Sequence, residues 1–142
     1  MNHRTLNVFA VLVIAGLLVA PAAFSQADRL KADIPFEFIV GNKTLPAGTY
    51  QVHCGTNNLV TLQSVDQNTA VGVLSQPGYA VKAPVTGKLI FTRYDNSYFL
   101  AQVWRPGVNS GSLMPKSKME REAATRVARP GATEIALQRD SR

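Results

Sequence analysis

The chain has 142 residues and a formal net charge of +6, and its single cysteine excludes an internal disulfide. This length provides one domain of ordinary size with a modest core. The basic excess suits anions such as lipid head groups or acidic polysaccharide, whereas no recognition motif supports nucleic acid as a partner.

The first 25 residues predict a cleaved signal peptide. Arg4 supplies a positive charge, residues 8–19 form an apolar run, and small residues follow that run. A charged start, a short apolar stretch and a small-residue exit are typical of export signals, and the run is shorter than the about 20 residues of a membrane span. We expect cleavage after Ser25, which leaves residues 26–142 as one β-rich domain in the periplasm or outside the cell, without a membrane span. An uncleaved anchor is the alternative.

From residue 34 onward, short runs of alternating apolar residues are separated by turns rich in Gly, Pro and Asn, which predicts strands. The expected strands are 34–40, 49–54, 59–64, 69–75, 88–93 and 97–104, with a possible last strand at 133–137. Pro35 favours an edge or a strand start, because proline donates no hydrogen bond. Residues 76–86 and 105–112 are expected to be loops.

The sixth run, residues 97–104, is apolar on both faces and is expected to be a central strand. Strict alternation places Tyr98, Leu100 and Trp104 on one face and Phe99 and Val103 on the other. Tyr98 and Trp104 are therefore interpreted mainly as packing residues.

One helix is expected at residues 117–129. Ser117 and Glu120 match a capping box, and Pro130 ends the pattern. The narrow apolar stripe of this helix suits a sheet edge or the end of a barrel. Parallel strands need crossover helices, and the chain offers only this one. The sequence therefore predicts an all-β fold, an antiparallel sandwich or small barrel of six to seven strands with one short C-terminal helix.

Residues 35–52 carry the pattern P-F-x-F-x-V-G-x-x-x-L-P-A-G-x-Y-x-V. In this segment the chain resembles a group of uncharacterised small exported bacterial proteins that share the pattern behind a signal peptide. The resemblance extends through residues 89–100 and ends in residues 113–122. It implies export, and it implies no activity and no catalytic residue.

Residue patterns for catalysis are absent from the sequence. His53 and Cys54 are neighbours in an expected strand and point to opposite faces, so they do not predict a nucleophile and base, and no metal-ligand spacing or cofactor motif occurs. We expect no catalytic residue, no metal and no cofactor. The alternative is a small carbohydrate-active or other hydrolase that uses a pair of carboxylates. The carboxylates considered for it are Glu37, Asp66, Asp95, Glu120, Glu122 and Glu134.

Binding is the function class that fits best. Tyr79, in a Pro/Gly loop, and Tyr94, in a turn, are the expected surface aromatic residues. Lys116, Lys118 and Arg121 concentrate positive charge around the helix. These five residues are the candidate ligand-binding set of an exported, noncatalytic binding or structural module of the cell envelope, with an anionic envelope component or polysaccharide as partner. Self-assembly through an exposed edge strand at 34–40 is a further alternative.

Overall fold

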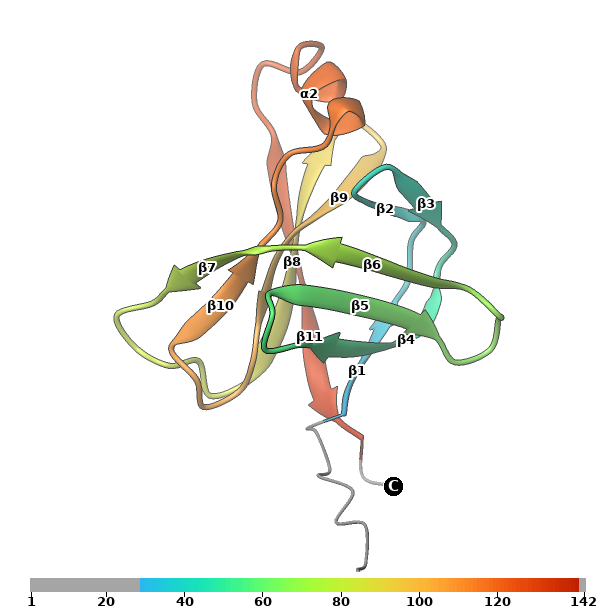
Figure 1. The fold of residues 1–142 in the computed structure, drawn as a ribbon. Helices are drawn as coiled ribbons and strands as arrows, with labels where there is room; N and C mark the ends of the chain where they lie inside the picture. Colours follow the sequence, from blue (N-terminus) through green and yellow to red (C-terminus); the bar gives the residue numbers. More distant parts are fainter. Residues whose placement is uncertain (1–28, 141–142) are drawn as a thin grey trace, which may run out of the picture.

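A computed structural model describes residues 29–140, so the predicted signal peptide lies outside the described residues (Figure 1). The described elements, in chain order, are β1 (Leu30–Ile34), β2 (Phe38–Val40), β3 (Lys43–Leu45), β4 (Gly48–Cys54), β5 (Leu59–Ser64), β6 (Ala70–Leu74), β7 (Gln76–Tyr79), β8 (Gly87–Tyr94), β9 (Ser97–Trp104), β10 (Ser110–Leu113), α2 (Lys118–Ala124) and β11 (Gly131–Arg139). The all-β class expected from the sequence is confirmed.

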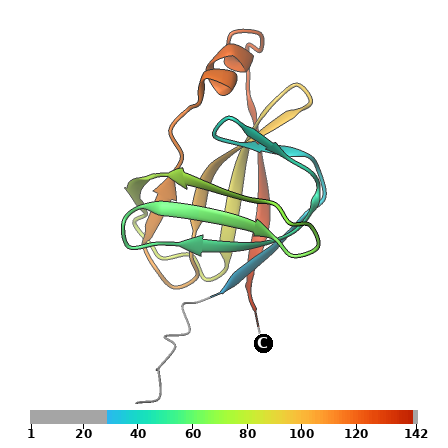
Figure 2. The ribbon, with the colours of Figure 1, turned by 45° about the vertical axis from the view of Figure 1, so that its right-hand side comes forward.

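The strands pair in the order β3-β2-β9-β8-β11-β1-β4-β5-β6, and this sheet curls into a nearly closed barrel (Figure 2). One edge of β9 is shared, because β2 pairs with its first half and β10 with its last three residues. The two ends of the sheet, β3 and β6, meet at a seam. There the Lys43 ammonium donates to the Ala70 carbonyl oxygen at 3.0 Å. This side-chain hydrogen bond joins two edge strands whose backbones do not pair with each other.

Inward-facing side chains fill the barrel. The main core cluster consists of Leu30, Ala32, Ile34, Phe38, Val40, Leu45, Tyr50, Val52, Val60, Leu62, Leu89, Phe91, Leu100, Val103 and Leu137. Phe38 packs edge-to-face on Tyr50 and on Phe91, with ring centroids 5.1 and 5.5 Å apart. The buried Tyr50 hydroxyl donates to the Pro46 carbonyl oxygen at 2.6 Å, so its polar end is satisfied. Strand alternation therefore assigns every second residue to packing and leaves the others for the outer surface.

The described residues contain eleven strands rather than the six to seven expected. The expected strand 34–40 is in fact two strands, because the chain leaves the ladder between Ile34 and Phe38, where Pro35 has no amide hydrogen. β1 pairs with β4 and β11, and β2 pairs with β3 and β9. The expected exposed edge at 34–40 is therefore wrong, and edge-led assembly through this segment loses its structural basis.

Two further strands lie where loops were expected. β7 and β10 pair with each other, and Gly78 permits this because a Cβ there would lie 2.9 Å from the Leu113 side chain. Both strands are rich in Gly, Ser, Pro and Gln, so no apolar alternation marks them in the sequence. By contrast, β5 and β9 match the expected ranges, β9 is central as expected, and the possible last strand is present and longer, as β11.

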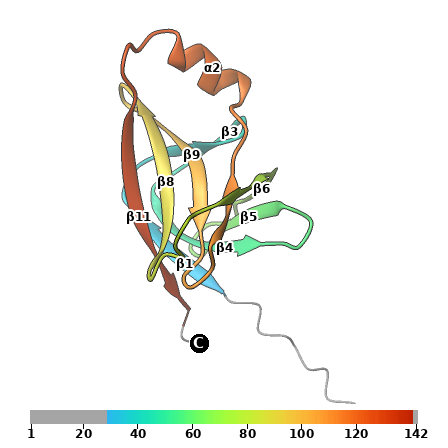
Figure 3. The same ribbon diagram turned by 90° about the vertical axis from the view of Figure 1, so that its left-hand side faces the viewer.

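The helix is shorter than the expected 117–129 and stands beside the β8–β9 turn at one end of the barrel (Figure 3). The Ser117 hydroxyl accepts the Glu120 amide at 3.2 Å, which confirms the N-cap. In a capping box the Glu120 carboxylate would reach back to the backbone amide of Ser117. Instead, it accepts a hydrogen bond from the Tyr94 hydroxyl at 3.3 Å. Tyr94 and Phe99 are 3% exposed but stand outside the main cluster, so this end has a second small packing layer. Within residues 29–140, no helix combines the length and apolarity that crossing a bilayer requires.

We predict that Glu120→Gln stabilises the protein at neutral pH. Glu120 is 5% exposed, and burial raises the pKa of its carboxyl, while the Tyr94 hydroxyl and the Lys116 charge lower it less. The fold therefore favours the protonated carboxyl of Glu120. The contribution of this group to the free energy of unfolding is complete below its ordinary pKa of about 4.5 and is lost as the pH rises through the raised pKa. Thermal unfolding at about pH 8 should show a midpoint a few degrees above the native one, and the difference should vanish near pH 4.

Glu122→Gln is the matched control, because Glu122 is exposed on the same helix. It should leave the pH dependence of the midpoint unchanged. A Glu120→Gln protein that unfolds below the native midpoint at about pH 8 would contradict the account.

Candidate functional site

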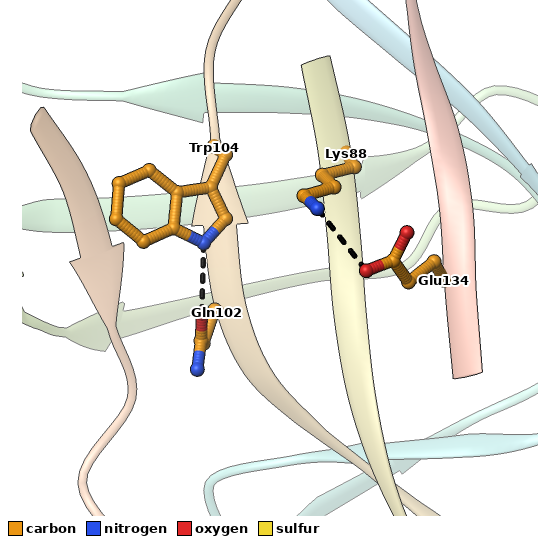
Figure 4. A network of polar contacts seen from close by, with 4 residues as sticks. All are labelled: Lys88, Gln102, Trp104 and Glu134. Carbon is orange, nitrogen blue, oxygen red and sulfur yellow. Dashed lines mark hydrogen bonds and ion pairs between the residues drawn. The ribbon is translucent and has the colours of Figure 1, made fainter. Parts of the chain in front are cut away.

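The outer face of β8, β9 and β11 carries four polar or aromatic side chains that form two linked pairs (Figure 4). The Trp104 indole nitrogen donates to the Gln102 side-chain oxygen at 2.8 Å. The Lys88 ammonium donates to the Glu134 carboxylate at 3.1 Å. Lys88 lies directly opposite Trp104 in the β8–β9 ladder, so the two pairs are neighbours on one surface.

A β-bulge in β9 turns Trp104 outward. Ile90 lies opposite Gln102, but Phe91 lies opposite Leu100, which leaves Ala101 as the extra residue. Leu100 and Val103 are therefore both buried although their numbers differ by three, and Trp104 points away from the core. The expectation that Leu100 and Trp104 share a face is wrong for this reason.

The indole lies flat on a glycine of the neighbouring strand. A Cβ at Gly111 would lie 2.6 to 2.7 Å from three atoms of the Trp104 ring, so the ring face covers this position and only glycine fits beneath it. Gly111 is the β10 residue directly opposite Trp104. Because one ring face rests on the strand, the other is turned away from the sheet (Figure 4). Packing and the hydrogen bond to Gln102 thus hold a flat aromatic surface in one orientation.

An open groove of about 270 Å³ runs over this surface. Its floor is formed by side chains of β8 and β9, and its wall by the loop after β7. The lining residues are Ala80, Lys82, Pro84, Lys88, Ile90, Gln102 and Trp104. Two backbone hydrogen bonds of 2.8 Å fix the wall, from the Ala80 amide to the Asn109 carbonyl and from the Gly107 amide to the Pro84 carbonyl. The groove is therefore preformed, with an aromatic residue and a few polar groups, as ligand sites commonly are.

A second open groove, of about 650 Å³, continues the same outer face across β11, β1 and β4. Asp33 and Glu134 both line it, so this groove contains two carboxylates. Asp33 accepts the Thr49 hydroxyl at 2.6 Å, and Glu134 is bound by Lys88. Glu134 was among the carboxylates considered from the sequence, whereas Asp33 was not.

The candidate residues expected from the sequence are not brought together. Tyr79 is 76% exposed near the end of β7, as expected for a surface residue. Tyr94 is 3% exposed, so its expected surface position is wrong, because it ends β8 and the helix segment covers it. Lys116, Lys118 and Arg121 are exposed around α2, which stands apart from β7 (Figure 1).

These groove residues were not predicted from the sequence, because strict strand alternation along residues 97–104 assigns Trp104 to a packing face. A usable signal was present, since Gln102 interrupts the apolar run at residues 98–104 and Lys88 directly precedes the apolar residues 89–91. Polar side chains at regular positions of a central strand indicate an outer face that meets solvent or a ligand. Tyr98, in the same strand, stacks on Phe36 with ring centroids 4.0 Å apart and serves packing as expected.

The residues considered for nucleophilic chemistry do not form a catalytic pair. His53 is exposed, whereas Cys54 packs against the core from the other face of β4. Burial raises the pKa of the Cys54 thiol, and the Arg105 charge and the Ser112 hydroxyl lower it less, so the unreactive protonated form is favoured. Among residues 29–140, no three His, Cys, Asp or Glu side chains gather in a way that could hold a metal ion.

Comparison with known proteins returns no match, whether the chain is scanned against protein-family models or searched against curated proteins and solved structures. The inference about function therefore depends on the geometry of the outer face.

We predict that Gly111→Ala displaces the Trp104 indole. The new Cβ would occupy space held by three ring atoms, and relieving such overpacking costs about 1–3 kcal/mol. Trp104 is the only tryptophan of the chain, so its fluorescence emission and its quenching by acrylamide report the movement directly.

Gly131→Ala provides a matched control, because the Cβ there meets its nearest neighbour, Arg93, at an ordinary 3.7 Å. Its emission and quenching should equal those of the native protein. Unchanged fluorescence in Gly111→Ala would contradict the packing of the indole on this glycine.

Proposed function

We propose that this chain is an exported, noncatalytic binding module of the bacterial cell envelope that holds polysaccharide in the groove over β8 and β9. One observation carries the proposal: the Trp104 indole is held flat over Gly111, beside Gln102 and Lys88, in an open groove. Export rests on the signal peptide predicted for residues 1–25.

The physical fit to a sugar is specific. A pyranose ring has an apolar face of C–H groups and a rim of hydroxyls, so it can stack on an aromatic ring while its rim meets polar side chains. Trp104 supplies the ring, and Gln102 and Lys88 supply the polar groups at its border. Because packing already holds the indole in place, little side-chain freedom is lost on binding.

The charge of the groove favours an acidic polymer. Lys82 in the wall adds a positive charge, and the charge of Lys88 is balanced by Glu134. The groove is open, which admits an internal stretch of a polymer as well as a chain end. Uronic acid carboxylates along such a polymer would be attracted by Lys82 and by the net positive charge of the protein.

A second candidate function is hydrolysis by a carboxylate pair, favoured by the shared groove of Asp33 and Glu134. Both carboxylates already accept hydrogen bonds from Thr49 and Lys88, as expected for structural roles. Incubation with polygalacturonate or dextran and assay of new reducing ends tests it. Release of reducing ends that Asp33→Asn and Glu134→Gln both abolish would support the hydrolase over the binding module.

We predict that the folded chain binds polygalacturonate more tightly than neutral dextran and that Trp104→Ala weakens this binding about tenfold or more. The loss reflects the removed stacking surface, since about 1.4 kcal/mol corresponds to a factor of ten. Isothermal titration or affinity electrophoresis measures the change, and Trp104→Phe should retain part of the affinity.

Two comparison variants separate this groove from the residues expected from the sequence. Tyr79→Ala removes an exposed aromatic residue that does not line the groove, and Lys118→Ala removes a helix charge. Both should bind polygalacturonate within about twofold of the native protein. Binding that survives in Trp104→Ala but is lost in either comparison variant would overturn the assignment of the groove.

A further inference from the structure

The loop that forms the groove wall has a second face, which is apolar and projects into solvent. Six large hydrophobic residues are exposed among residues 29–140, and the three with the highest exposure lie within seven positions of each other. They are Tyr79 at 76%, Val81 at 110% and Val85 at 89% exposed. Ala80, Lys82 and Pro84 line the groove, whereas Val81 and Val85 do not. The loop thus has one face toward the groove, which carries Lys82, and an apolar face toward solvent.

The projection of these side chains is fixed by the frame of the protein. The hydrogen bonds from Ala80 to Asn109 and from Gly107 to Pro84, both 2.8 Å, tie the loop to the β9–β10 turn. The loop lies at the end of the barrel opposite α2 (Figure 3). The three apolar side chains are therefore held in water by a tied loop, which costs free energy unless an apolar phase covers them.

The charge around the apolar face is positive. In the sequence from residue 67 to residue 119, Asp95 is the only carboxylate, and it lies in the β8–β9 turn beside α2, away from the loop. Lys82 is in the loop and Arg105 begins the turn bound to it. Val85 and Arg139 line one hollow of about 360 Å³. Asp140 follows Arg139 in the sequence, and its backbone amide donates to the Arg29 carbonyl oxygen. Basic groups therefore outnumber acidic ones around this end.

We infer that an apolar surface made of Tyr79 at the end of β7 and of Val81 and Val85 in the loop that follows inserts into the surface of an anionic lipid bilayer. Valine side chains partition into the acyl boundary, and tyrosine prefers the level of the head groups. Lys82, Arg105 and Arg139 would then meet anionic head groups, each at a favourable Coulomb energy. This inference goes beyond the proposed function, because it assigns a second surface and a second partner.

A second copy of the chain is the competing occupant, and the area argues against it. A stable dimer buries about 800 Å² on each partner, and three side chains on a projecting loop supply much less. A bilayer needs no complementary pocket, so it accepts a projecting loop of this size.

The test uses the chain from Gln26 onward, which contains every described strand and lacks the apolar run at 8–19 that would itself bind lipid. Sedimentation is measured with vesicles of equal parts phosphatidylglycerol and phosphatidylcholine, and with vesicles of phosphatidylcholine alone. We expect binding to the anionic vesicles that weakens as salt is raised, and much less binding to the neutral ones.

The double variant Val81→Asn/Val85→Asn should lose about tenfold or more of the vesicle affinity, because two uncharged polar side chains replace the inserted ones and the net charge is unchanged. Val65→Asn is the matched control, since Val65 is 49% exposed in the β5–β6 turn, and it should bind as the native protein does. Lys118→Glu should also bind within about twofold, which separates the loop from the basic residues of α2.

Each remaining outcome overturns the inference: no binding of the native chain, equal binding to neutral vesicles, unchanged binding of the double variant, or loss in Lys118→Glu instead. A concentration-dependent dimer in size-exclusion chromatography that the double variant abolishes would assign the loop to self-contact. Polygalacturonate binding should be equal in the native chain and the double variant, so failure of the groove proposal is distinguishable from failure of this one.

Discussion

One extra residue in β9 determines what the outer surface of this protein presents. Ala101 has no partner in the β8 ladder, so side-chain parity changes between Leu100 and Gln102. Leu100 can then pack inside against Phe91, and Val103 inside opposite Leu89. The Ala101 carbonyl oxygen accepts the Met114 amide at 2.8 Å, which ties the bulge to the segment after β10. Without the bulge, Leu100 and Trp104 would share a face, and either the core would lose a leucine or the surface would lose its indole.

The filled interior explains why the candidate sites lie on the outside. Phe38, Tyr50 and Phe91 occupy the barrel centre in edge-to-face contact, and small barrels are commonly filled by side chains in this way. The outward residues of β8, β9, β11 and β1 then form a continuous surface with two grooves, one beside Trp104 and one beside Asp33. The loop after β7 contributes one face to the first groove and leaves the other face open. A rigid barrel thus presents both a ligand groove and an apolar loop on one frame.

Sequence reasoning succeeds where local pattern decides structure and fails where pairing partners decide it. The ranges of β5 and β9 follow from apolar runs bounded by turn residues, and the Ser117 cap follows from local hydrogen bonding. β7 and β10 could not be found in this way, because each depends on the other and on Gly78 and Gly111 admitting neighbouring side chains. Tertiary structure also decides the positions of Tyr94 and Trp104. Tyr94, expected on the surface, is covered by the helix segment. Trp104, expected in a packing position, is turned outward by the bulge in β9.

The measurement that tests this account most directly is the register between β8 and β9, read from backbone nuclear Overhauser contacts in solution. The account predicts contacts that place Ile90 opposite Gln102 and Phe91 opposite Leu100, with Ala101 left unpaired. A regular ladder that keeps Phe91 opposite Leu100 would place Ile90 opposite Ala101 and Lys88 opposite Val103, so that Trp104 faces the core, and it would contradict the account. In that arrangement the outward aromatic surface, and the binding function inferred from it, would have no structural basis.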